Sequence, residues 1–127
     1  MVIITNNSMV CEQLHNTAHK NIRFIEGNYE AVLIEVRNLI HNHYKLLTHP
    51  LSGSIKPNET PYKTIALETG TQLDYDSLHL IEKAIATYEK MQNTKSTPDW
   101  TERVLDDFRT IDCDLFINAI KNVSFPT

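Results

Sequence analysis

The stretch KLLTHPLSGSIKPNETPYKTIAL, which runs from Lys45 to Leu67, decides how this chain can fold. Short apolar runs at its two ends, Leu46–Leu47 and Ile65–Leu67, have the composition of strands, and a long polar segment rich in proline separates them. A connection of this length inside a compact domain is uncommon and is usually either functional or disordered. We therefore expect the functional site to include this connection.

Before this stretch, strands and helices are predicted to alternate. Val2–Ile4 is a short, fully apolar run that suits a central strand. A helix capped within Asn6–Ser8 follows it, and the next strand is expected over Ile22–Ile25. Tyr29–His43 then shows one apolar stripe at helical spacing. Leu46–Thr48 is predicted to be the third strand.

After the connection, one more strand and then only helices are predicted. Thr64–Leu67 is the fourth strand. Of the three helices expected after it, the first is capped by Asp76 or Ser77, the second begins at Thr97–Pro98, and the third covers Leu115–Val123.

This order of elements predicts a single α/β domain over residues 1–127. The domain should be layered, with a central, mostly parallel four-stranded sheet, helices on both faces and extra carboxyl-terminal helices. The direction of the fourth strand stays open, because a loop and not a helix precedes it. Ligands in open α/β sheets gather beyond the carboxyl ends of the strands. The Thr5–Ser8 turn and the Thr48–Tyr62 connection both leave such ends, so the two polar segments meet at one rim if the first and third strands are neighbours.

The predicted ligand-binding site takes residues from both polar segments. Hydroxyls, backbone amides near a glycine and a lysine would together hold a phosphate or a carboxylate. A plainer interpretation is a proline-stiffened surface loop beside a turn that only caps a helix. The Walker A and G-x-G-x-x-G patterns are absent. The candidate ligand-binding residues are Thr5, Asn6, Asn7, Thr48, His49, Ser52, Gly53, Ser54 and Lys56.

The same connection also supports an enzymatic alternative. His49 could move a proton near neutral pH, with Ser52 or Ser54 beside it. A Ser-His-Asp arrangement of Ser52, His49 and Asp74 has little support, because the G-x-S-x-G motif is absent.

Other reactive side chains point to ordinary structural roles. His15 and His19 have i, i+4 spacing without a supporting third ligand, so no metal and no other cofactor is expected. Cys11 and Cys113 are far apart in the sequence and are expected to be free, idle thiols, although a thiolate in the first helical turn would be stabilised. A solvated acidic surface is expected at Asp106, Asp107, Asp112 and Asp114.

Composition excludes several classes of protein. The chain has 127 residues and a formal net charge of −4, which argues against general nucleic-acid binding. It has no apolar run of about 18 residues, so no membrane span is expected. The MVIITNN start lacks the basic region of a signal peptide, which predicts a cytoplasmic protein.

Three segments resemble the GrdX family: IITNN at Ile3–Asn7, LLTHPLSGSIKP at Leu46–Pro57 and NETPY at Asn58–Tyr62. Members of this family are small proteins encoded with the glycine, sarcosine or betaine reductase systems of bacteria that ferment amino acids anaerobically. The resemblance implies a cytoplasmic accessory protein of a selenium-dependent reductase pathway. It supplies no catalytic residue that can be carried over to this chain.

The expected function is therefore that of a non-catalytic accessory or regulatory protein. Its expected partners are a small anionic ligand at the rim or a protein of the reductase system, and neither nucleic acid nor membrane. One alternative is a small hydrolase or an acyl- or phosphoryl-transfer enzyme that uses His49. Another is a structural partner protein, or a homodimer, that uses the connection as a contact arm.

Overall fold

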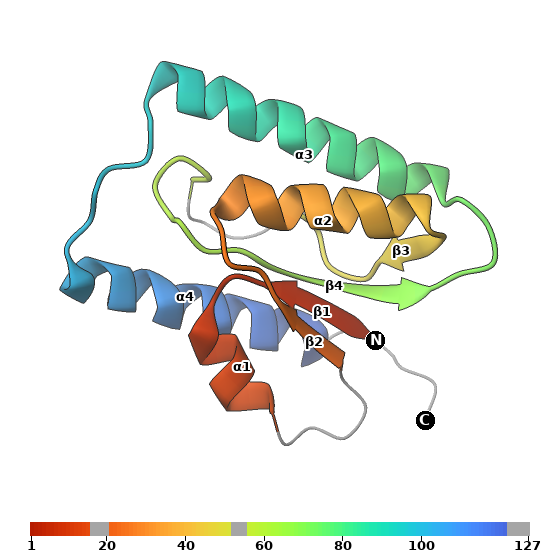
Figure 1. Ribbon diagram of the computed structural model, residues 1–127, viewed down its shortest axis with the longest axis horizontal. Coiled ribbons are helices and arrows are strands. Elements are labelled where there is room, and N and C mark those ends of the chain that lie inside the picture. The colour runs from red at the N-terminus through yellow and green to blue at the C-terminus, as the bar shows by residue number, and fades with distance from the viewer. Residues whose placement is uncertain (16–20, 52–55, 122–127) are drawn as a thin grey trace.

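The computed structural model describes residues 1–15, 21–51 and 56–121. Four strands and four helices occur in these ranges (Figure 1). In chain order they are β1 (Val2–Thr5), α1 (Ser8–Leu14), β2 (Asn21–Phe24), α2 (Tyr29–His41), β3 (Tyr44–Leu46), β4 (Thr64–Thr69), α3 (Tyr75–Thr94) and α4 (Glu102–Lys121).

The sheet is mixed, with strand order β2-β1-β4-β3. β1 pairs with β2 in parallel, whereas β4 is antiparallel to both β1 and β3. The first three strands therefore point the same way, as predicted, but the expectation of a mostly parallel sheet was wrong. Parallel neighbours need a crossover connection, usually a helix, and the chain between β3 and β4 supplies none in its described part. β4 enters between β1 and β3, so those two strands are not neighbours.

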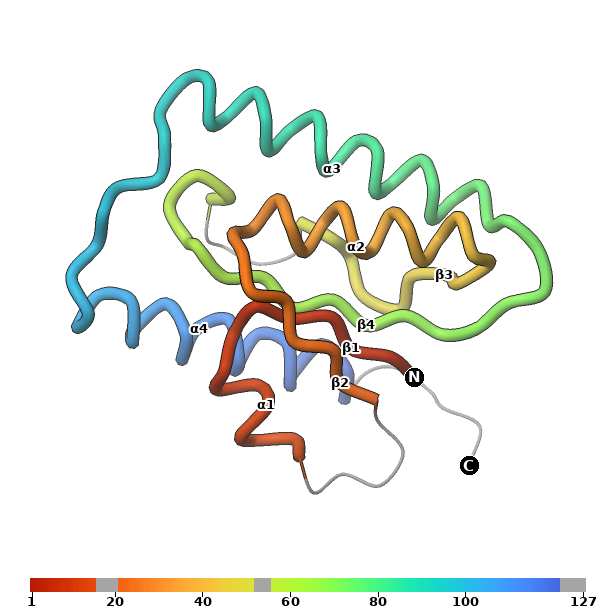
Figure 2. Tube along the Cα trace, viewed as in Figure 1, coloured from red at the N-terminus to blue at the C-terminus, as the bar shows by residue number. Residues whose placement is uncertain are grey.

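Helices cover both faces of this sheet (Figures 1 and 2). Because side chains alternate along a strand, β1 and β4 contribute to two separate apolar clusters. On the face of α2 and α3 the buried strand residues are Val2, Ile4, Ile65 and Leu67. On the face of α1 and α4 they are Ile3 and Ala66.

The apolar stripe predicted for α2 is confirmed, since its inner residues are buried against the sheet and α3. The predicted cap of α3 was wrong by two or three residues, because the N-cap is Asp74. The helix begins at Tyr75, and the Asp74 carboxylate accepts hydrogen bonds from the backbone N–H and the hydroxyl of Ser77. Asp76 and Ser77 therefore lie inside the first turn.

The two helices predicted after residue 97 are one helix, α4, which starts at Glu102. Thr101 precedes it, and its hydroxyl oxygen accepts from the backbone N–H of Val104 at 3.4 Å. The residues between the two predicted helices include neither proline nor glycine, so nothing in the backbone interrupts the helix. Among the helices in the described ranges, none has the length and apolar character needed to cross a membrane.

Candidate functional site

Asn6 joins the turn after β1 to the end of the long connection. Its side-chain amide donates to the carbonyl oxygens of Gly27 at 3.0 Å and Pro61 at 2.8 Å, and its Oδ1 accepts from the backbone N–H of Lys63 at 2.9 Å. The first turn and the last residues of the connection therefore meet at one end of the sheet (Figure 1). The two polar segments predicted to form a rim are thus in contact through Asn6, although β4 lies between β1 and β3.

A directional chain of hydrogen bonds continues from this turn to α4. The backbone N–H of Asn7 donates to Thr5 Oγ1 at 3.0 Å, and the hydroxyls of Thr5 and Thr64 lie 2.7 Å apart. The Thr64 hydroxyl donates to Asp112 Oδ2 at 2.8 Å, so the proton between the two threonines comes from Thr5. Thr5 and Thr64 are a directly opposed pair of β1 and β4. The strand register thus fixes where the Asp112 carboxylate is held.

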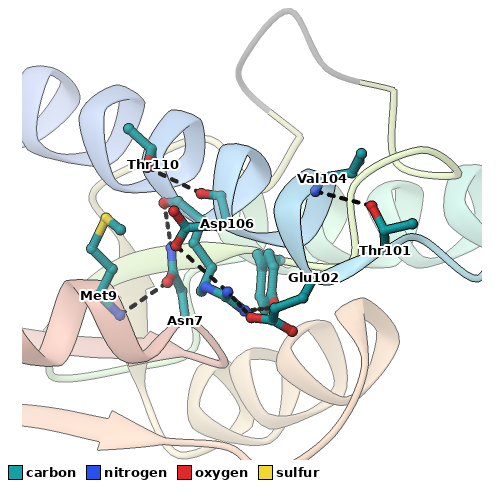
Figure 3. A network of polar contacts seen from close by, with 9 residues as sticks. Asn7, Met9, Thr101, Glu102, Val104, Asp106 and Thr110 are labelled. Atoms are coloured by element: carbon teal, nitrogen blue, oxygen red, sulfur yellow. Dashed lines mark hydrogen bonds and ion pairs between the residues drawn. The ribbon is translucent and has the colours of Figure 1, made fainter.

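Asn7 attaches α1 to α4. It is completely buried and is the N-cap of α1, where its Oδ1 accepts from the backbone N–H of Met9 at 3.0 Å. Its amide group donates to Asp112 Oδ2 at 3.0 Å and to the backbone carbonyl of Arg109 at 2.9 Å. Figure 3 shows Asn7 between Met9 and helix α4. Every polar atom of the Asn7 side chain therefore has a structural partner.

A pocket opens beside this network. It has about 270 Å³ of empty space, including solvent at its mouth. Its lining combines polar residues of the connection, β4 and α4 with apolar residues of α4. The lining residues are Thr48, Lys63, Thr64, Asp112, Leu115, Phe116 and Ala119.

Lys63 and Asp112 give this pocket one basic and one acidic group. Lys63 is only 6% exposed, and burial lowers its pKa from 10.5 to about 8, although the Asp112 charge acts in the opposite direction. Burial also raises the pKa of Asp112, against the hydrogen bonds from Asn7 and Thr64 and the charge of Lys63. Desolvation thus outweighs pairing for both groups and brings their pKa values closer together.

The end of the connection is also attached to α4 and to the segment before it. The Arg109 guanidinium donates to the Tyr62 hydroxyl at 2.7 Å and lies 5.6 Å from the centre of that ring. Arg109 pairs in turn with Glu102, which Figure 3 shows at the start of α4. Trp100 Nε1 donates to the carbonyl oxygen of Glu59 at 2.7 Å. These contacts hold the chain immediately before Lys63.

The candidate residues predicted from the sequence have different surroundings. Thr5, Asn6 and Asn7 are buried and hydrogen-bonded within the protein, and they support the pocket without lining it. Thr48 lines the pocket, and its hydroxyl oxygen also accepts from the backbone N–H of Ala66 at 3.0 Å. His49 is exposed, and its Nδ1 accepts from the Leu51 backbone N–H at 3.0 Å.

Lys56 is exposed as well, and its backbone carbonyl oxygen accepts from the N–H groups of Glu59 and Thr60. The remaining predicted residues, Ser52, Gly53 and Ser54, lie outside the described residues.

Sequence reasoning missed the three central residues of the pocket, Lys63, Thr64 and Asp112. Asp112 was expected on a solvated acidic surface, and this was wrong because it is half-buried and accepts two hydrogen bonds. A signal did exist, since Asp112 lies four residues before the buried Phe116 and so shares its helix face. Thr64 likewise lies two residues before the buried Ala66, so the two side chains point to the same face of β4.

Neither cysteine is among the residues that line the pocket, and neither is any of the described histidines. Cys11 and Cys113 are free cysteines, as predicted. Burial raises the pKa of Cys11 and raises that of Cys113 to about 11, so the expected stabilisation of a Cys11 thiolate was wrong. Within residues 1–15, 21–51 and 56–121, no group of three or more His, Cys, Asp or Glu side chains could hold a metal ion.

Comparison with known proteins identifies the family of this chain. Neither a search of curated proteins nor a search of solved structures finds a protein similar to this chain. The family described as GrdX-like protein matches residues 2–121, a range that includes every residue lining the pocket. The match extends well beyond the three segments that carry the resemblance in the sequence. The chain belongs to the GrdX-like protein family.

Proposed function

We propose that this protein is a cytoplasmic accessory component of a glycine reductase system and binds a small anionic ligand in the pocket lined by Lys63. The family supports the association with such a system. The single observation that supports ligand binding is a buried lysine on the wall of an open pocket, at the rim where the predicted polar segments meet.

Lys63 is suited to hold an anion because it is already desolvated. An ammonium group in a poorly solvated wall attracts an anion more strongly than one in water, since less solvent screens the charge. Thr48 also lines the pocket, and its hydroxyl, which accepts from the Ala66 N–H, can donate its own hydrogen to a ligand oxygen.

Asp112 makes the binding of an anion depend on pH. Its carboxylate repels an anion, whereas its protonated form donates a hydrogen bond to one. Because burial already raises the pKa of Asp112, an anion nearby raises it further and draws a proton onto the carboxyl group. Binding should therefore be accompanied by proton uptake and should be tighter at lower pH.

An accessory role is preferred to catalysis by His49. His49 is exposed and is not among the residues that line the pocket, and its Nδ1 accepts a backbone hydrogen bond. A His49→Ala variant should therefore keep its ligand affinity.

Isothermal titration calorimetry and thermal-shift measurements with phosphate, acetate, acetyl phosphate, glycine and betaine test the ligand. At least one anion should raise the melting temperature, and more at about pH 6 than at about pH 8. Lys63→Met should remove the effect, whereas Lys83→Met, on the exposed surface of α3, should keep it. No shift with any of these compounds, or an equal shift in Lys63→Met, would overturn the proposed site.

Lys56→Met separates this pocket from a site in the connection alone. If Lys56→Met removes the shift and Lys63→Met does not, the anion binds to the exposed connection. Association with the reductase system is tested independently, by asking whether tagged protein co-purifies with reductase subunits from a cell that produces them.

A further inference from the structure

We propose that the Lys63 amine is a nucleophile that condenses with a small carbonyl compound, an aldehyde or an oxo acid, to form an imine in this pocket. The proposal concerns the same pocket as the proposed function and adds a chemical class of ligand. It depends on three features that meet there: the buried amine, the Asp112 carboxyl group and the apolar wall of α4.

The first requirement is an amine that is partly unprotonated. Burial lowers the pKa of Lys63 to about 8, so roughly a tenth of its side chains are neutral at pH 7. An exposed lysine with an ordinary pKa is neutral in fewer than about one in a thousand molecules at this pH. Desolvation in a poorly polar pocket is a known way to activate a lysine for imine formation.

The second requirement is a group that moves protons between the steps. The neutral Nζ attacks the carbonyl carbon, a C–N bond forms, and the C=O bond becomes a C–OH group as a proton passes from nitrogen to oxygen. Loss of that hydroxyl as water needs one more proton, and the Asp112 carboxyl group can supply it because its pKa is raised. The products are the protonated imine, one water molecule and the Asp112 carboxylate, and no oxidant or reductant takes part.

The negative charge of Asp112 also favours imine formation over carbamate formation. A protonated imine keeps the positive charge of the lysine that it replaces, so the Asp112 carboxylate stabilises it. Carbon dioxide would convert the same amine into an anionic carbamate, which the carboxylate would repel. The Asn7 amide and the Thr64 hydroxyl hold Asp112 Oδ2 at 3.0 and 2.8 Å, so this counter-ion is fixed in place.

The third requirement is protection from water. Leu115, Phe116 and Ala119 form the apolar part of the pocket lining. Phe116 is buried and Leu115 is 39% exposed, which puts the more accessible side chain nearer the solvent. An apolar wall excludes water from the imine and slows its hydrolysis. The limited space admits only a small carbonyl compound.

Reductive trapping tests the proposal directly. The protein is incubated at about pH 7 with glyoxylate or acetaldehyde and sodium cyanoborohydride, and alkylated lysines are then measured by peptide mass spectrometry. Lys63 should be alkylated at least about tenfold faster than Lys83, the exposed reference in the same molecule. Asp112→Asn should slow trapping at Lys63 and leave Lys83 unchanged.

A measurement on the unfolded wild-type protein removes any dependence on how a variant folds. In concentrated urea the advantage of Lys63 over Lys83 should disappear, because it arises from burial. Equal rates at the two lysines in the folded protein would overturn the proposal. Anion-induced stabilisation without trapping refutes the imine but not the proposed ligand, whereas trapping without anion-induced stabilisation refutes the anionic ligand but not the imine.

Discussion

The pH dependence of stability depends directly on the burial of Lys63. In the folded protein its pKa is about 8, against an ordinary value of 10.5. Between these values the folded state has released the proton while the unfolded state still holds it, so the free energy of unfolding rises with pH. At about 1.4 kcal/mol for each pH unit, the full gain is about 3 kcal/mol. Lys63 is 6% exposed, so solvent screening reduces this value little.

Urea denaturation at pH values from about 7 to about 10.5, followed by the fluorescence of the single tryptophan, measures this gain. Other groups also contribute in this range, among them Cys113, whose pKa is raised from an ordinary value of 9.0 to about 11 in the folded protein. The difference between wild type and Lys63→Met cancels their contributions. This difference should change by about 3 kcal/mol over the range, whereas Lys83→Met should follow wild type. A difference that stays constant over the range would refute the inference that Lys63 is buried in its charged form at neutral pH.

Three further substitutions test contacts of the fold, two of them beside the pocket and one at the opposite end of β4, and urea denaturation measures each of them. Asn7→Ala removes the cap of α1 and one donor to Asp112, and it should lower the free energy of unfolding by about 2–3 kcal/mol; a loss below about 0.5 kcal/mol would contradict these contacts. Thr64→Val keeps the side-chain shape but removes the donor to Asp112, at an expected cost of about 1–3 kcal/mol, and an unchanged stability would show that this bond is not formed. Gly70→Ala places a Cβ 2.8 Å from the carbonyl oxygen of His43, which accepts a hydrogen bond from the Gly70 N–H. The free energy of unfolding should therefore fall by about 1–3 kcal/mol, and a stabilised variant would contradict that close approach.

The local elements of the fold could be predicted because their apolar patterns are strong. The helix stripe from Tyr29 onwards and the buried run Val2–Ile4 both appear where the sequence places them. The direction of β4 could not be predicted, because a long connection permits either direction and only pairing with β1 and β3 decides between them. The joining of two predicted helices into α4 follows from the absence of a helix-breaking residue, a signal that the sequence did contain.

The location of the candidate site was predictable in part, and its chemistry was not. Of the predicted residues, Thr48 lines the pocket and Asn6 accepts a hydrogen bond from the backbone of Lys63, and both follow strand ends that are visible in the sequence. The burial of Lys63 was hidden, since a lysine in a polar connection is normally exposed. Its environment depends on Asp112, which is nearly fifty residues away and reaches the pocket only through the packing of α4. Contacts of this kind follow from tertiary structure and leave no local pattern.

The position of β4 in the middle of the sheet has a consequence for synthesis of the protein. β1 and β4 are neighbours in the sheet but far apart in the sequence, as the pair Val2–Leu67 shows. In the described sheet, β3 pairs only with β4. A nascent chain that ends before residue 64 can pair β1 only with β2, and it leaves one edge of β1 and all of β3 open. Open edges of apolar strands invite pairing between molecules. Ribosome-stalled or truncated products that end in the connection should therefore aggregate, and those that extend past Thr69 should do so less.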